Sequence, residues 1–281
     1  MRLGPPWGHR FFAWVLFAVL AVMLPLLALH AHTLYVQHRA AQDAVHQQVL
    51  ARSADTAVVL NQTFARAETL LRLLASREDL RSLDPARCER VLEGLAGLDP
   101  LYGNVAVADA EGAVVCASVA HSTRRPLRLG GARWQAALAS DDIALSKPAS
   151  AGPILGRPVA VLTLPLRDAS GRRIGLVGLS LDLITMAERV LATGLPPGGS
   201  MTLVDTEDTV FTRYPDAEQW VGTQLPRTVR VVRRDQPQGV VSATGPDGVT
   251  RVYATTPLAV HGLRVASGIP DDVVLAAARE H

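Results

Sequence analysis

Histidine side chains near the N-terminus are the first groups whose spacing could hold a metal ion. His30, His32, His38 and His46 follow a strongly apolar segment. On a helix, His30 and His32 do not share a face, and His38 and His46 are too far apart to be adjacent on one turn. We therefore expect interfacial or solvated histidines here, and no metal site.

Carboxylates gather at a second place, Asp205, Glu207 and Asp208. Calcium loops of the EF-hand type need a longer loop with further oxygen ligands, so a solvated hairpin turn is the better interpretation. The sequence also has no phosphate-binding loop, no Gly-x-Ser-x-Gly motif and no His-Glu-x-x-His motif. We expect no catalytic residues and no cofactor.

The balance of charges argues against a nucleic-acid partner. The 281 residues include 28 Lys or Arg and 26 Asp or Glu, which gives a net charge of +2. Proteins that bind nucleic acid usually carry a marked basic excess on one face.

An apolar segment near the N-terminus predicts a membrane helix. Residues 11–29 contain no charge, and a helix of this length nearly crosses a hydrocarbon core of about 30 Å. Arg2 and Arg10 precede it, so the positive-inside rule places the N-terminus in the cytoplasm and the chain from about residue 32 outside. A cleaved signal peptide is the alternative, because small residues occur at 28–31, but the apolar segment is longer than signal peptides usually have.

A long helix is expected to follow the membrane segment. Between Pro25 and Pro85 there is no Gly and no Pro. Apolar residues recur at helical spacing, at Val45, Val49, Leu60, Phe64, Leu70, Leu71 and Leu74. This stripe predicts packing on a domain core, the seam of a homodimer, or both, since a long helix has more than one face.

From Tyr102 onward the apolar residues alternate with period two, which is typical of strands. "NVAVADAEGAVVCAS" and "PVAVLTLPLRDASGRRIGLVGLSLDL" predict two hairpins, and "SMTLVDTEDTVFTRYP" with the strands that follow predicts a weak repeat of the same arrangement. The fold class is therefore α+β, with two small antiparallel sheets in tandem, each backed by helix and partly open on one face.

The sequence resembles the double Cache (PDC) sensor domains of bacterial histidine kinases, diguanylate cyclases and chemoreceptors. The resemblance rests on "ALASDDIALSKPASAGPILGRPVAVLTLPLRDASGRRIGLVGLSLDL", "YGNVAVADAEGAVVCAS" and "LVDTEDTVFTRYPDAEQWVGTQLP", and covers about residues 35–275. It implies two PAS-like modules on one long N-terminal helix. The expected parts are a cytoplasmic N-terminus (1–10), a transmembrane helix (11–31), a long signalling helix (32–77), a membrane-distal module (78–190), a membrane-proximal module (191–270) and the start of an exit helix (271–281).

The resemblance also implies a ligand pocket in the distal module. Arg133 and Trp134 on a short helix would line it, with Tyr102, Ser118 and Ser180 as weaker candidates. An Arg suits an anionic group, and Trp provides a flat apolar wall. The alternative for Trp134 is an anchor of the core.

Two departures from the family concern the recognition of amino acids. Family members that bind amino acids often carry charged residues where this chain has Gly130 and Gly131, and an acidic residue where it has Ser180. An amino acid needs a cation for its carboxylate and an anion for its ammonium group. We therefore do not carry this specificity over.

Cys88 and Cys116 are the only cysteines, and both lie outside the cytoplasm on the predicted topology. The helix that carries Cys88 is expected to pack on the strand that carries Cys116, and the resembling family often has cysteines at these places. An exported protein can form a disulfide. Two buried thiols that never pair are the alternative.

These observations favour an extracytoplasmic ligand-sensing input domain, anchored in the bacterial inner membrane by a single span. The expected partners are a small molecule, with an anionic group if Arg133 binds it, the membrane and a second copy of the chain through the long helix. The alternative is a structural or partner-binding exodomain without a ligand. The sequence leaves open whether the chain is the sensor part of a longer kinase, cyclase or chemoreceptor or stands alone.

Overall fold

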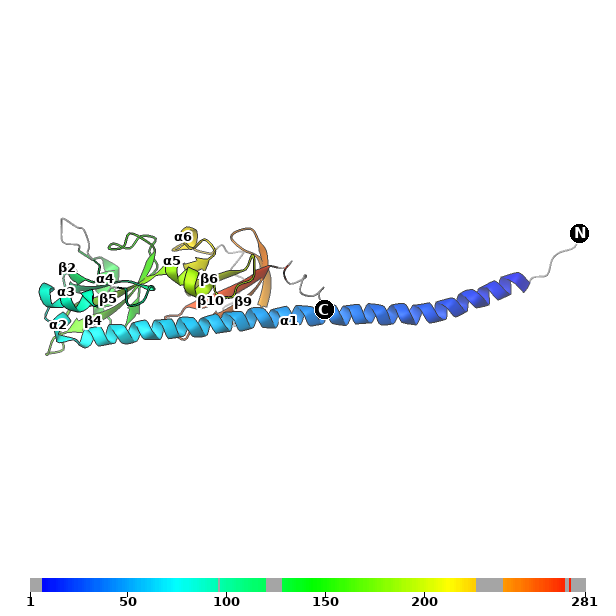
Figure 1. The fold of residues 1–281 in the computed structure, drawn as a ribbon, viewed down its shortest axis with the longest axis horizontal. Coiled ribbons are helices and arrows are strands. Elements are labelled where there is room, and N and C mark those ends of the chain that lie inside the picture. The colour runs from blue at the N-terminus through cyan, green and yellow to red at the C-terminus, as the bar shows by residue number, and fades with distance from the viewer. Residues whose placement is uncertain (1–6, 96, 120–127, 226–239, 271–272, 274–281) are drawn as a thin grey trace, which may run out of the picture. The chain divides into compact units, whose positions relative to one another are not determined.

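The structure is a computed structural model. It describes residues 7–95, 97–119, 128–225, 240–270 and 273. The chain divides into two compact units, Met1–Gln47 with Asp272–His281, and Gln48–Asp271. A long N-terminal helix precedes two antiparallel sheets of five strands each (Figure 1), so the predicted α+β class is confirmed.

Helix α1 (Trp7–Ser76) runs for 70 residues and contains Pro25. Within it, the 19 residues Val19–Gln37 are apolar enough to cross a membrane, and none of the most apolar stretch is buried. A soluble domain rarely exposes so continuous an apolar surface. This segment overlaps the span predicted at 11–31 and is the candidate membrane anchor.

The part of α1 that belongs to the larger unit buries one stripe of side chains. These residues recur at intervals of three or four, at Val49, Ser53, Ala57, Leu60, Phe64, Ala67, Leu71 and Leu74. Ser53 Oγ lies 2.7 Å from Thr256 Oγ1 of the second sheet module, and Arg72 Nη2 lies 2.7 Å from Asp142 Oδ1 of the first. The helix therefore packs on both modules.

The first module is built on a sheet with the strand order β2-β1-β5-β4-β3. Its strands are β1 (Tyr102–Asp109), β2 (Val114–Ala117), β3 (Ala144–Leu145), β4 (Val159–Arg167) and β5 (Arg173–Asp182). Its helices are α2 (Glu78–Arg81), α3 (Pro85–Glu93) and α4 (Ala132–Ala139). We refer to this sheet and its helices as the distal module.

The hairpin between β4 and β5 shows how the sequence enforces a turn. Asp168 Oδ1 accepts hydrogen bonds from the backbone N–H groups of Ser170 and Arg172, at 2.9 and 3.0 Å. Gly171 has a φ of 83°, which side-chain-bearing residues rarely adopt. The two apolar strands are thereby held in antiparallel register, with Leu162 opposite Leu179.

The second, proximal module repeats this arrangement with the strand order β7-β6-β10-β9-β8. Its strands are β6 (Ser200–Val204), β7 (Val210–Tyr214), β8 (Val240–Thr244), β9 (Thr250–Pro257) and β10 (Arg264–Pro270). Helix α5 (Leu183–Met186), a π-helical turn (Ala187–Leu191) and α6 (Ala217–Trp220) complete the described elements. The weak repeat in the sequence thus corresponds to two sheets of equivalent topology.

Candidate functional site

The open face of the distal sheet holds a cavity of about 600 Å³, on the side away from α1. Successive side chains of each strand point to opposite faces of the sheet, and those on the open face form the floor of the cavity. The floor residues are Asn104, Ala106 and Ala108 of β1, Val159, Val161 and Thr163 of β4, and Leu176, Gly178 and Ser180 of β5. The intervening side chains, such as Val107, Leu162 and Leu179, join the core that contains α1. One face of the sheet therefore serves packing and the other is free for binding.

The floor of the cavity is low because its central residues are small. In the sheet register, Ala106, Gly178 and Thr163 lie side by side on three strands. A Cβ atom at Gly178 would lie 3.3 Å from Val161 Cγ1. The absence of that side chain leaves the space open.

Helix α4 forms one wall of the cavity. Trp134 is 9% exposed and packs with Ala108 and Leu176 in a small core of its own. Its indole Nε1 donates a hydrogen bond to the carbonyl of Ala110 at 3.4 Å. Trp134 thus both anchors α4 to the sheet and presents an apolar surface to the cavity.

Asn104 is the most buried polar side chain of the lining, with 2% exposure. Its Oδ1 accepts hydrogen bonds from Ser118 Oγ at 3.1 Å and from the backbone N–H of Val119 at 3.2 Å. A backbone N–H can only donate, so it fixes the orientation of the amide. Asn104 Nδ2 is buried without a hydrogen-bond partner, so this donor is available to an acceptor atom of a ligand.

Lys147 lies at the edge of the cavity, but its ammonium group is directed at the proximal module. Nζ lies 2.5 Å from Asp205 Oδ2 and 3.1 Å from Glu207 Oε2. The hydrogen bond to Asp205 raises the pKa of Lys147, against the opposing effect of burial. Burial also opposes ionisation of Asp205, but the hydrogen bond from Lys147 and two backbone N–H groups outweigh it and lower the pKa of Asp205. The pair therefore links the cavity to the second sheet.

The same contacts explain the acidic cluster of the β6–β7 turn. Asp205 Oδ1 accepts the backbone N–H groups of Glu207 and Thr209, and Asp208 forms an ion pair with Arg264. In the described part of the chain, no group of three or more His, Cys, Asp or Glu side chains could hold a metal ion. The carboxylates hold the turn and bind cationic side chains.

The five predicted ligand-binding residues fall into three groups. Trp134 and Ser180 line the cavity. Tyr102 and Ser118 lie instead at a separate pocket of about 50 Å³, where burial and then the charge of Asp99 raise the pKa of Tyr102. Arg133 lies on α4 beside Trp134, but its side chain lies outside the described part of the structure.

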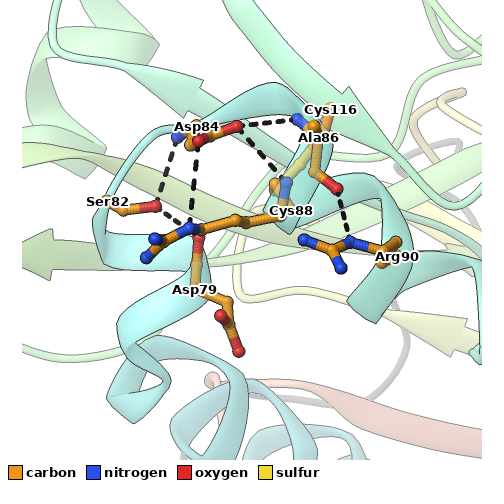
Figure 2. The surroundings of a disulfide bond; sticks show 8 residues. Asp79, Ser82, Asp84, Ala86, Cys88, Arg90 and Cys116 are labelled. Atoms are coloured by element: carbon orange, nitrogen blue, oxygen red, sulfur yellow. Dashed lines mark hydrogen bonds and ion pairs between the residues drawn. A yellow bond between two sulfur atoms is a disulfide. The ribbon is translucent and has the colours of Figure 1, made fainter.

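Cys88 of α3 and Cys116 of β2 are joined by a disulfide, and their Cα atoms are 6.0 Å apart (Figure 2). Asp84 caps α3, because its Oδ1 accepts the backbone N–H groups of Ala86 and Arg87. Both cysteines are buried in the core. The bridge fixes α3 to the edge strand of the distal sheet.

Sequence reasoning missed Asn104 and Lys147. Asn104 could have been found from the alternation of β1, since it shares parity with Ala106 and Ala108. Lys147 has no such signal, because its partner Asp205 is 58 residues away in the chain.

No model of a known protein family matches the chain, and no curated protein is similar enough in sequence to count as a relative. Solved structures do match. The first is described as the extracellular domain of a histidine kinase, rpHK1S-Z16, with 22% identity and a TM-score of 0.74, covering 84% of this chain and 98% of that domain.

Two chemoreceptor domains are also similar. The ligand-binding domain of Pseudomonas fluorescens CtaA, solved with L-isoleucine, has 18% identity and a TM-score of 0.69, covering 86% of this chain and 99% of its own. The fold that this chain shares with these domains is the double Cache fold. The ligand-binding domain of Pseudomonas aeruginosa PctB, solved with L-Arg, has the same double Cache arrangement, with 19% identity and a TM-score of 0.69, covering 83% of this chain and 98% of its own. The fold implied by the sequence resemblance is thereby confirmed.

Proposed function

We propose that this chain is the extracytoplasmic ligand-sensing input domain of a membrane-bound bacterial signal-transduction protein. The observation that supports this most is the cavity of about 600 Å³ on the open face of the distal sheet, which is in the usual size range of small-molecule sites. Domains with this fold have been solved with L-isoleucine and with L-Arg. They are ligand-binding and not catalytic domains, which supports a binding role.

The proposal includes a single membrane span in the inner membrane, with the chain from about residue 32 in the periplasm. The exposed apolar segment Val19–Gln37 and the disulfide between Cys88 and Cys116 support this topology, because disulfides persist outside the cytoplasm. The modules then comprise about residues 78–190 and 191–270.

A homodimer through α1 is part of the same proposal. Val58, Val59 and Leu73 are exposed on α1, while the opposite stripe of the helix is buried on the sheets. A second copy would cover these side chains and place two signalling helices next to each other.

The lining of the cavity narrows the class of ligand. The described lining residues include no carboxylate, and the ammonium group of Lys147 is already engaged by Asp205 and Glu207. A free amino acid needs an anionic partner for its ammonium group. We therefore propose a largely apolar ligand without an ammonium group, with Asn104 as hydrogen-bond donor and Arg133 as partner of an anionic end.

A matched pair of molecules tests this. The full chain in lipid nanodiscs is heated with 4-methylpentanoate or with L-leucine, which differ only by the α-ammonium group. A ligand that binds the folded state alone at about 100 times its Kd adds about 2.7 kcal/mol, which raises the Tm by about 5 °C or more. We expect the acid to raise the Tm more than the amino acid does.

Two variants locate the binding. Ala106→Leu fills the cavity floor, whereas Ala117→Leu places the same side chain on the paired position of β2, outside the lining. Stabilisation should disappear in the first and remain in the second. If L-leucine stabilises the chain as much as 4-methylpentanoate does, the proposed ligand class is refuted, but the pocket is not. A metabolite screen in which every stabilising compound also stabilises Ala106→Leu would refute the pocket.

A further inference from the structure

The outer face of the proximal sheet is polar and buried. Six side chains on the side away from α1 form this proximal polar face, Ser200, Thr202, Arg213, Arg251, Tyr253 and Thr255. The other face of the same sheet is mainly apolar and joins the core through residues such as Met201, Leu203 and Val265. A protein buries a polar face only when its groups have partners.

The proximal polar face corresponds to the cavity floor of the distal module. The strand orders β2-β1-β5-β4-β3 and β7-β6-β10-β9-β8 match strand by strand, with β5 and β10 in the centre. Small residues lie at the centre in both modules, Gly178 in the distal sheet and Ala266 in the proximal one. Ala266 lies between Thr202 and Thr255 in the register, so the side chain at this point of the face is a single methyl group.

Two buried guanidinium groups share one carboxylate on this face. Arg213 Nη2 and Arg251 Nη1 each lie 2.8 Å from an oxygen of Asp247, and the two arginine side chains are 2% and 3% exposed. Arg213 Nη1 also donates to Thr202 Oγ1 at 3.0 Å. The three charged groups together carry one excess positive charge, and a buried unpaired charge is costly.

Polar atoms on this face also lack hydrogen bonds. Ser200 Oγ, Thr255 Oγ1 and Arg213 Nε are buried and have no partner within the part of the chain that the structure describes. Each unsatisfied buried group is destabilising, and native proteins contain few of them. Their presence on one face, beside an excess positive charge, indicates that a polar anion completes the site.

We propose that the proximal polar face is a second binding site, which takes a small monocarboxylate. Its charge matches the excess of one, and its two oxygens can accept from Arg213 Nε and from the hydroxyl groups of Ser200 and Thr255. Only a small molecule suits the position above Ala266. Asp247 remains 22% exposed, so the cluster reaches solvent beside the β8–β9 turn.

Trp220 offers a local reporter of this site, because its ring lies 5.7 Å from the Arg213 guanidinium carbon. The full chain in nanodiscs, with Trp7, Trp14 and Trp134 replaced by Phe, is titrated with acetate and pyruvate. Acetamide, which has nearly the same shape as acetate but no charge, is the control. We expect saturable changes in Trp220 emission with the two carboxylates and none with acetamide.

Thr255→Val removes one unpartnered hydroxyl without changing the size of the side chain. It should weaken carboxylate binding about tenfold, as the loss of one buried hydrogen bond does. Thr244→Val, on the exposed edge strand β8, is the matched control and should leave binding unchanged. Ala106→Leu should also leave it unchanged, because that variant blocks only the distal cavity.

The outcomes separate this site from the distal pocket. A carboxylate response that Thr255→Val weakens and Ala106→Leu preserves supports the proposal. No response, or a response that Thr255→Val leaves intact, overturns it. If neither the wild type nor Thr255→Val responds to carboxylates and Thr255→Val is the more stable of the two, the Thr255 hydroxyl is unsatisfied without any ligand, and this too overturns the proposal.

Discussion

Replacement of Asp247 by Asn removes the carboxylate that Arg213 and Arg251 share. Both guanidinium groups are nearly inaccessible to water, so no solvent replaces the lost acceptor. Removing one partner of a buried ion pair costs about 3–5 kcal/mol. Because Asp247 itself keeps 22% exposure, we expect the lower end of this range, about 3 kcal/mol.

Acid should reproduce part of this effect in the wild type. Burial opposes the ionisation of Asp247, but the hydrogen bond from Arg251 and the charge of Arg213 outweigh it and lower the pKa of Asp247 from 3.8 to about 2. A carboxyl whose pKa is lower in the folded state stabilises fully above its unfolded pKa, and this contribution is lost as the pH falls through the folded pKa. It amounts to roughly 2 kcal/mol, and Asp247→Asn should remove it.

Thermal unfolding measures both effects, followed by the fluorescence of Trp220 in the chain with Trp7, Trp14 and Trp134 replaced by Phe. For a domain of this size about 1 kcal/mol corresponds to about 2–4 °C, so Asp247→Asn should lower the Tm by about 6–12 °C at neutral pH. Asp168→Asn is the matched control. Asp168 also pairs with an Arg four residues later in a hairpin turn, but Arg172 is 79% exposed. A Tm loss no larger than that of Asp168→Asn would refute the role given to Asp247.

Three further predictions concern the connections within the chain. Lys147→Met removes the ammonium group bound by Asp205, and calorimetry should then show two unfolding transitions; one unchanged transition would contradict the coupling of the modules. Periplasmic protein unfolded without reductant should show no thiol reactive toward maleimide, and reduction of Cys88–Cys116 should cost about 3–4 kcal/mol. Two labelled thiols would contradict both the pairing and the topology. Single cysteines on the exposed face of residues 48–76 should crosslink in membranes with a heptad period, and a flat profile would argue against the dimer.

Local patterns in the sequence were enough for the longer strands and for part of the cavity, but not for the short β3 (Ala144–Leu145). In β5 the alternation of Gly178 and Ser180 with Leu179 separates the cavity face from the core face. The position of Tyr102 could not be obtained in this way. The pairing of β1 with β5 shifts register between Tyr102 and Asn104, so Asn104 and not Tyr102 lines the cavity.

Tertiary contacts decided the remaining features. Arg213 and Arg251 would be expected in solvent from their charge alone, and Asp247 from the β8–β9 turn offsets part of the cost of burying them. Lys147 follows the same rule, since Asp205 comes from a different module. Charge partners distant in the chain leave no periodic signal.

Titration of a chain with Trp134 as its single tryptophan tests ligand binding in the distal cavity most directly. Trp7, Trp14 and Trp220 are replaced by Phe, and the emission of Trp134 is followed as a stabilising ligand is added. Because Trp134 lines the cavity, its emission should change saturably with the same Kd as the thermal stabilisation, and Ala106→Leu should abolish both. If no stabilising ligand changes the emission of Trp134, or if Ala106→Leu abolishes the stabilisation while the emission of Trp134 never changed, binding in this cavity is contradicted.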